Sequence, residues 1–154
     1  GIQYWIEENP YVALCVGRTD EKLVHHQLFH AIETKVFSDS QLYYEWDALN
    51  PKGFSYDYNF DLWQTREETK YLEGKNRAFI DSFSMTFPNE DRARIMEYAI
   101  TADNESCFES DSMQKKLLQL CRGIRKAFGL EKSEDVYPWE QYLEESIAYV
   151  PKKK

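Results

Sequence analysis

Two histidines separated by three residues, His26 and His30, constrain this chain more than any other feature. Thr19-Asp20-Glu21 is typical of a helix start, and apolar residues then recur at helical spacing as far as Val36. Residues four apart lie on the same face of a helix, so both imidazoles can bind one metal ion. The pattern H-x-x-x-H also arises by chance, so a metal site needs further support.

A metal site of this kind needs a third protein ligand, and catalytic zinc sites often take one from another element. Glu90 is the first choice and Asp91 the second, because both lie in the first turn of a helix predicted from Pro88 to Thr101. The competing explanation is that any acid in a first turn gains about 0.3–1 kcal/mol from the helix dipole. Taken alone, their position favours the dipole explanation.

Three more residues are candidates for a supporting role. Glu33 lies seven residues after His26, where it can hydrogen-bond to a metal ligand and orient it. An ion pair with a lysine such as Lys35 explains Glu33 equally well. Asp91 has the same orienting role if Glu90 is the ligand. His25 lies about 100° around the helix from His26 and is expected to flank the site.

The whole chain predicts an α+β domain, predominantly helical, with a small N-terminal β-hairpin or sheet edge. Its 154 residues are 42% apolar and 16% aromatic, which is enough for one core, so residues 1–154 are expected to form one domain. The predicted strands are Ile2–Ile6 and Tyr11–Val16. The predicted helices are Thr19–Ser38, Asp39–Leu49, Pro88–Thr101, Asp111–Phe128 with Gly129 as its stop, and Trp139–Ile147. The irregular aromatic segment from residue 54 to about residue 65 either packs over the core or rims a cleft, and we favour packing.

Charge and hydropathy exclude two classes of partner. The formal net charge is -8 and the only basic run is Lys152-Lys153-Lys154, so nucleic acid is not expected. No window holds the roughly 18 apolar residues that span a bilayer, so no membrane insertion is expected. Gly1 stands where an initiator Met would be, so a signal, an anchor or a preceding region can have been removed.

Cys15, Cys107 and Cys121 are odd in number and show no C-x-x-C spacing. They predict neither a disulfide framework nor a cysteine metal site. We expect small buried apolar side chains at these positions, although one pair could still form a bridge.

Four ordered motifs together resemble a bacterial family of zinc-binding metallopeptidases. The motifs are His26-Gln27-Leu28-Phe29-His30-Ala31-Ile32-Glu33 with Phe37-Ser38-Asp39-Ser40, then Leu49-Asn50-Pro51-Lys52-Gly53-Phe54, then Ser82-Phe83-Ser84-Met85-Thr86, and last Pro88-Asn89-Glu90-Asp91-Arg92-Ala93. The family belongs to the zincins that use glutamate as the third ligand. The likeness runs from about residue 20 to about residue 130. Four motifs in order are far more specific than H-x-x-x-H.

The resemblance implies a zincin-like fold, Zn²⁺ on His26, His30 and Glu90, and hydrolysis of a peptide or protein substrate. The motif spacing is also similar to the catalytic region of anthrax lethal factor, where a tyrosine stands seven residues before the glutamate ligand. Here Phe83 holds that position, and Gln27 holds the position of the glutamate in H-E-x-x-H. Gln27 cannot take a proton from water. Phe83 cannot donate to the oxyanion that forms in amide hydrolysis.

Three interpretations remain open. The chain is an inactivated zinc peptidase, a natural non-catalytic zinc module that binds a peptide or protein, or a metal-free helical interaction domain. We favour the first, because Gln27 and Phe83 conserve the shapes of Glu and Tyr and leave every ligand intact. The family resemblance also implies an extracellular or cell-surface protein.

Overall fold

A computed structural model describes residues 2–6, 9–14, 17, 20–40, 45–58, 70–74, 76–101 and 105–151. Within these ranges the chain is predominantly helical. The α-helices are α1 (Glu21–Ser40), α3 (Pro88–Thr101) and α4 (Asp111–Ala127). An antiparallel hairpin of β1 (Ile2–Ile6) and β2 (Asn9–Ala13) precedes them, with Tyr4 opposite Tyr11. Short 3-10 turns complete the structure: η2 (Asp47–Leu49), η4 (Phe83–Met85), η5 (Glu105–Phe108) and η6 (Pro138–Glu140).

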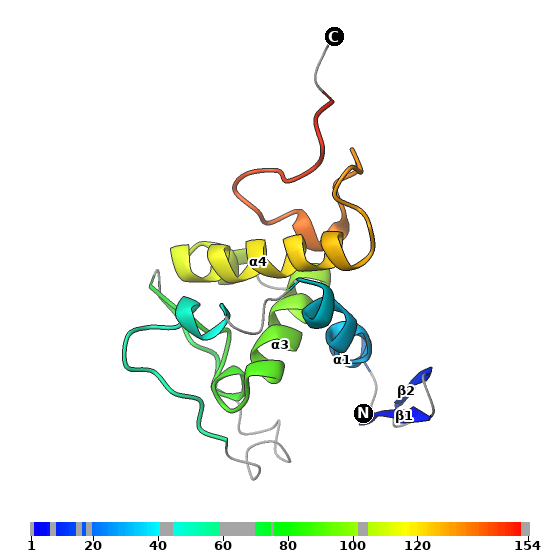
Figure 1. The fold of residues 1–154 in the computed structure, drawn as a ribbon. Helices are drawn as coiled ribbons and strands as arrows, with labels where there is room; N and C mark the ends of the chain where they lie inside the picture. Colours follow the sequence, from blue (N-terminus) through cyan, green and yellow to red (C-terminus); the bar gives the residue numbers. More distant parts are fainter. Residues whose placement is uncertain are drawn as a thin grey trace.

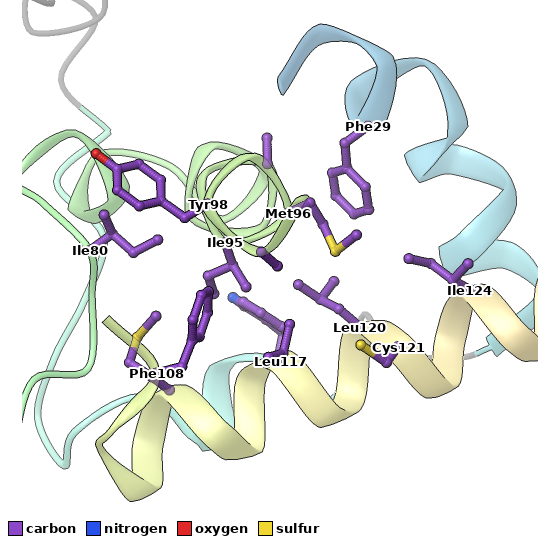
Figure 2. Packing of buried hydrophobic residues seen from close by; sticks show 14 of the residues in the cluster. Phe29, Ile80, Ile95, Met96, Tyr98, Phe108, Leu117, Leu120, Cys121 and Ile124 are labelled. Atoms are coloured by element: carbon purple, nitrogen blue, oxygen red, sulfur yellow. The ribbon is translucent and has the colours of Figure 1, made fainter. Parts of the chain in front are cut away.

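Helix α3 lies at the centre of the helical part, in contact with α1, α4 and η4, and α4 lies across the other two helices (Figure 1). Phe29 of α1, Met96 of α3 and Leu120 of α4 point toward one another in the core (Figure 2). Every residue of α3 from Glu90 to Ala99 is buried. An amphipathic helix usually buries only one stripe. The charged side chains of α3 must therefore find their partners inside the protein.

The predicted ends of the long helices agree with the structure. Helix α3 has the predicted bounds, and α1 ends at Ser40, two residues beyond the predicted end. Helix α4 ends at Ala127, followed by Gly129 with a φ of +67°. The Leu130 N–H donates to Arg125 O at 2.7 Å, and the Gly129 N–H donates to Lys126 O at 3.3 Å. These two bonds form a Schellman motif, whose left-handed position favours glycine.

The predicted helix Asp39–Leu49 is wrong for its described part. Residues 39–40 belong to α1, residues 41–44 lie outside the described residues, and the chain then forms a turn and η2. The indole of buried Trp46 donates to the Tyr56 hydroxyl at 2.9 Å. Asn50 is extended, with a ψ of 155°, as expected before Pro51. The hydrogen bond of Trp46 to Tyr56 and the extended backbone before Pro51 do not allow a regular helix over this segment.

The predicted helix Trp139–Ile147 is also wrong, because only η6 forms there. The Gln114 side chain donates to Tyr142 O at 2.7 Å and accepts from the Glu144 N–H at 3.1 Å. A side chain of α4 therefore satisfies backbone groups that a helix would have paired. Glu140 in η6 forms a buried ion pair with Arg125, at 2.6 Å from Oε1 to Nε, which holds this segment on α4.

The remaining predictions for the chain are confirmed only in part. The second strand lies two residues earlier than predicted, and Cys15 and Val16 fall outside the described residues. Phe54 and Tyr56 pack on the core as expected, Tyr58 is exposed, and residues 59–65 are not described. Cys107 and Cys121 are free thiols in the core, as predicted. No described helix has both the length and the apolar character needed to cross a membrane.

Candidate metal centre

The structure brings together His26 and His30 of α1 and Glu90 of the first turn of α3. Glu90 Oε2 lies 3.0 Å from His26 Nε2 and 3.4 Å from His30 Nε2, and the two Nε2 atoms are 3.1 Å apart. The other oxygen of Glu90, Oε1, accepts from Asn89 Nδ2 at 3.2 Å. His26 and Glu90 are buried, and His30 is nearly so. The three side chains form a group that can hold a metal ion.

The spacing of these three atoms is compatible with a shared metal ion as well as with hydrogen bonds. A tetrahedral zinc ion with bonds of about 2.05 Å holds its ligand atoms about 3.3 Å apart. Both Nδ1 atoms lie beside carboxylates, so the N–H of each neutral ring belongs on Nδ1 and the lone pair on Nε2. Two nitrogen lone pairs and a carboxylate oxygen then face one another. Only a shared cation, a metal ion or a proton, relieves their repulsion.

A glutamate lies beside the Nδ1 atom of each histidine, and an arginine of α3 donates to each of these glutamates. His26 Nδ1 lies 3.0 Å from Glu97 Oε2, and Arg94 Nη1 donates to both oxygens of Glu97 at 2.9 and 3.1 Å. His30 Nδ1 lies 3.4 Å from Glu33 Oε2, and Arg92 Nε donates to Glu33 Oε1 at 2.7 Å. Hydrogen bonds of this type fix the tautomer and orientation of metal-binding histidines.

The metal-free triad binds a proton tightly. Burial lowers the pKa of His30, but hydrogen bonds to Glu33 and Glu90 and their negative charges outweigh burial and raise it from 6.5 to about 9. Burial raises the pKa of the Glu90 carboxyl, but the two histidines outweigh burial and hold it below its ordinary value. At neutral pH a metal ion must therefore displace a proton from the site.

We expect the metal-free protein to lose stability as the pH rises from 6.5 to about 9, because the folded state binds a proton at His30 that the unfolded state has lost. This contribution is complete below pH 6.5 and disappears as the pH passes the folded pKa. Urea unfolding across this range, with and without a chelator, measures it. A bound metal ion would replace the proton, so the metal-loaded protein should not lose stability in this way. A metal-free profile identical to that of His30→Ala would contradict the expectation.

Phe83 and Gln27 both lie close to the triad, although neither contacts it through a polar group. The ring of Phe83 is buried, and its centroid is 6.2 Å from that of His26. Turn η4 carries Phe83 immediately before α3, which places residue 83 beside the ligand helices. Gln27 follows His26 on α1 and is 8% exposed. The structure therefore places the ring of Phe83 beside His26, and it places Gln27 as the buried neighbour of His26 along α1.

The structure corrects the predicted role of Asp91. Its Oδ2 atom accepts from Lys116 Nζ at 2.7 Å, from the Tyr56 hydroxyl at 2.8 Å and from Trp46 Nε1 at 3.3 Å. Successive residues of a helix project about 100° apart. Glu90 therefore faces α1 while Asp91 faces α4 and the Trp46 region. Asp91 is a residue of the core, and it is neither a ligand nor a support for one.

Glu33 lies beside the triad, and His25 lies outside it. Glu33 lies 3.4 Å from His30 Nδ1 and accepts from Arg92 Nε at 2.7 Å, which are contacts that an orienting role requires. His25 is part-exposed and lies 3.7 Å from Glu21, outside the triad.

Sequence reasoning missed Glu97, Arg92, Arg94 and Asp81. A usable signal was present for Glu97, because Glu90 and Glu97 are seven residues apart on one helix, as His26 and Glu33 are on α1. No local pattern pointed to Arg94 or Asp81, since their contact joins two segments.

A separate cavity of about 740 Å³ lies between α4 and the C-terminal segment. Leu118, Leu143 and Ile147 line it together with charged residues of both signs, and it shares no residue with the triad. The triad lies where α1 meets α3, and this cavity is a different feature of the molecule. No protein-family model, no curated protein and no solved structure matches the chain.

Proposed function

We propose that this chain is the zinc-binding domain of a metallopeptidase, in a form that lacks two groups needed for hydrolysis. The observation that carries the proposal is the convergence of His26, His30 and Glu90 at the spacing of a tetrahedral ion. Two imidazoles and a carboxylate from two elements are the donor set of catalytic zinc sites such as those of thermolysin-type enzymes. Phe83 beside His26 supports the further step from a metal site to a peptidase site.

When bound, zinc would polarise a substrate carbonyl and make water more acidic. The protein's own contribution falls to positions 27 and 83. A carboxylate at position 27 would accept a proton from the attacking water and pass it to the leaving amine. A hydroxyl at position 83 would donate to the oxyanion. Gln27 and Phe83 do neither, so the chain as written should bind a peptide without cleaving it.

A natural non-catalytic zinc module is the second candidate, and Gln27 and Phe83 themselves favour it. Such a module would bind a peptide or protein partner at the same place. Zinc content does not separate the two candidates, because both need the triad. Peptide cleavage by the variant with Gln27→Glu and Phe83→Tyr separates them, since a module that never cleaved peptides should stay inactive.

We expect the purified protein to bind one zinc ion per chain, and His26→Ala and Glu90→Ala to weaken zinc binding by more than about a hundredfold. Loss of a ligand should exceed the roughly 10–100-fold effect of losing a supporting residue. Chelator competition with elemental analysis measures both quantities. The matched control is His25→Ala, which removes an imidazole from the same helix outside the triad. A parent protein without zinc affinity would instead support the metal-free interaction domain.

A further inference from the structure

A buried chain of charged residues connects ligand His26 to the turn that carries Phe83. His26 Nδ1 bonds to Glu97 Oε2 at 3.0 Å, and both Glu97 oxygens bond to Arg94. Arg94 Nε donates to Asp81 Oδ2 at 2.8 Å. The side chains of all four residues are at most 5% exposed. A charge in such a place is stable only when it is paired, so each member fixes the next.

Asp81 organises turn η4 with its second oxygen. Asp81 Oδ1 accepts from the Ser84 N–H at 2.8 Å and from the Ser84 hydroxyl at 2.9 Å. These bonds hold the backbone on both sides of Phe83. The ring of Phe83 in turn lies 5.2 Å from the guanidinium carbon of Arg94. Arg94 thus touches the carboxylate behind His26, the carboxylate that shapes the turn, and residue 83 itself.

The contact between His30 and Glu33 is longer and more exposed than the contact between His26 and Glu97. Glu33 lies 3.4 Å from His30 Nδ1, and the side chains of this pair are 11% and 12% exposed. The Glu97 pair is shorter and more deeply buried, and Arg94 Nη1 donates to both oxygens of Glu97. Buried charge-assisted hydrogen bonds are the stronger ones. The orientation of His26 therefore depends more on its carboxylate than that of His30 does.

We propose that Glu97, held by Arg94 and Asp81, is the positioning residue for His26, and that this chain couples the metal ligand to the turn carrying residue 83. The inference rests on the proposed metal site. Glu97 touches no substrate and acts through the imidazole that it orients. Arg94 sets the distance between His26 and position 83, because it contacts the partners of both.

The experiment measures cobalt and zinc affinity by chelator competition, together with the visible spectrum of the cobalt-loaded protein. Glu97→Gln keeps the size of the side chain and removes its charge, and it should weaken metal binding by about 10–100-fold. Its cobalt spectrum should change, since the ligand field depends on the orientation of His26. Arg94→Lys and Asp81→Asn should shift both readouts in the same direction by smaller factors, because they act one and two contacts further away.

The matched control is Glu140→Gln, which removes a charge from another buried glutamate–arginine pair that contains no residue of the triad or of its supporting chain. It should lower stability and leave metal affinity and the cobalt spectrum unchanged. If Glu97→Gln does not fold, Arg94→Lys carries the test, because it retains the positive charge. Parent-like affinity and spectrum in a folded Glu97→Gln or Arg94→Lys protein would overturn this inference alone. A parent that binds neither metal would overturn the proposed function and the inference together.

Discussion

The variant that carries both Gln27→Glu and Phe83→Tyr is expected to cleave peptides at least about ten-thousandfold faster than the parent chain. A general base and an oxyanion donor are each worth about a hundredfold or more in rate, and the two act on different atoms of the reaction. Both changes preserve the shape of the side chain they replace, and residue 83 already lies beside His26. Release of new amino termini from a zinc-loaded protein and a peptide library measures the gain.

The single variants and a ligand variant make this result interpretable. Gln27→Glu and Phe83→Tyr should each recover part of the activity by itself, about a hundredfold, because the base and the oxyanion donor act on different atoms. Adding Glu90→Ala to the double variant should abolish cleavage if the metal site is responsible. A folded double variant that binds zinc and cleaves nothing in the library would favour the non-catalytic peptide-binding module.

The second large effect is expected at the buried ion pair of Lys116 and Asp91. Lys116→Met should lower the free energy of unfolding by about 3–5 kcal/mol, because it leaves a carboxylate uncompensated in the core. Neither side chain is accessible to solvent, and Lys116 Nζ lies 2.7 Å from Asp91 Oδ2 and 2.8 Å from Ala78 O. Since small domains are stable by about 5–15 kcal/mol, the variant should be close to unfolding.

A double variant separates the cost of an unpaired charge from the loss of packing. Lys116→Met with Asp91→Asn should regain most of the stability, because replacing a whole buried pair is often nearly neutral. The aliphatic control is Lys115→Met at the exposed neighbouring position, which should change stability by no more than about 0.5 kcal/mol. Urea unfolding in the presence of a chelator excludes the contribution of metal binding. A Lys116→Met protein as stable as the control would show that the pair does not hold the core.

The pair also explains why Asp91 was misassigned. Burial raises the pKa of Asp91 and lowers that of Lys116, and each charge opposes the shift of the other. Lys116, which lies 25 positions away in the sequence on α4, therefore decides the role of Asp91. Nothing in the local sequence around Asp91 carries that information. Its first-turn position suggested a ligand or a helix-dipole contact, and taken alone it favoured the dipole contact.

The sequence alone predicted the features that depend on neighbouring residues. The helical spacing around His26 and His30, the start of α3 at Pro88 and the stop of α4 at Gly129 all follow from local geometry, and the structure confirms them. Helical periodicity places both imidazoles on one face without reference to the rest of the chain. The candidate set of His26, His30 and Glu90 came from these elements together with the family resemblance.

Only the tertiary structure decided which distant residues meet. It brought Glu90 to within 3.0 Å of His26, from 64 positions away, and turned Asp91 toward Lys116 instead. It placed Glu97 beside His26 and Arg94 beside Glu97. It also brought the side chain of Gln114 to the backbone after Glu140, where the predicted helix does not form. The physical reason is the packing of α3 on all sides, since a helix buried all round must pair every charge with whatever residue the neighbouring elements present.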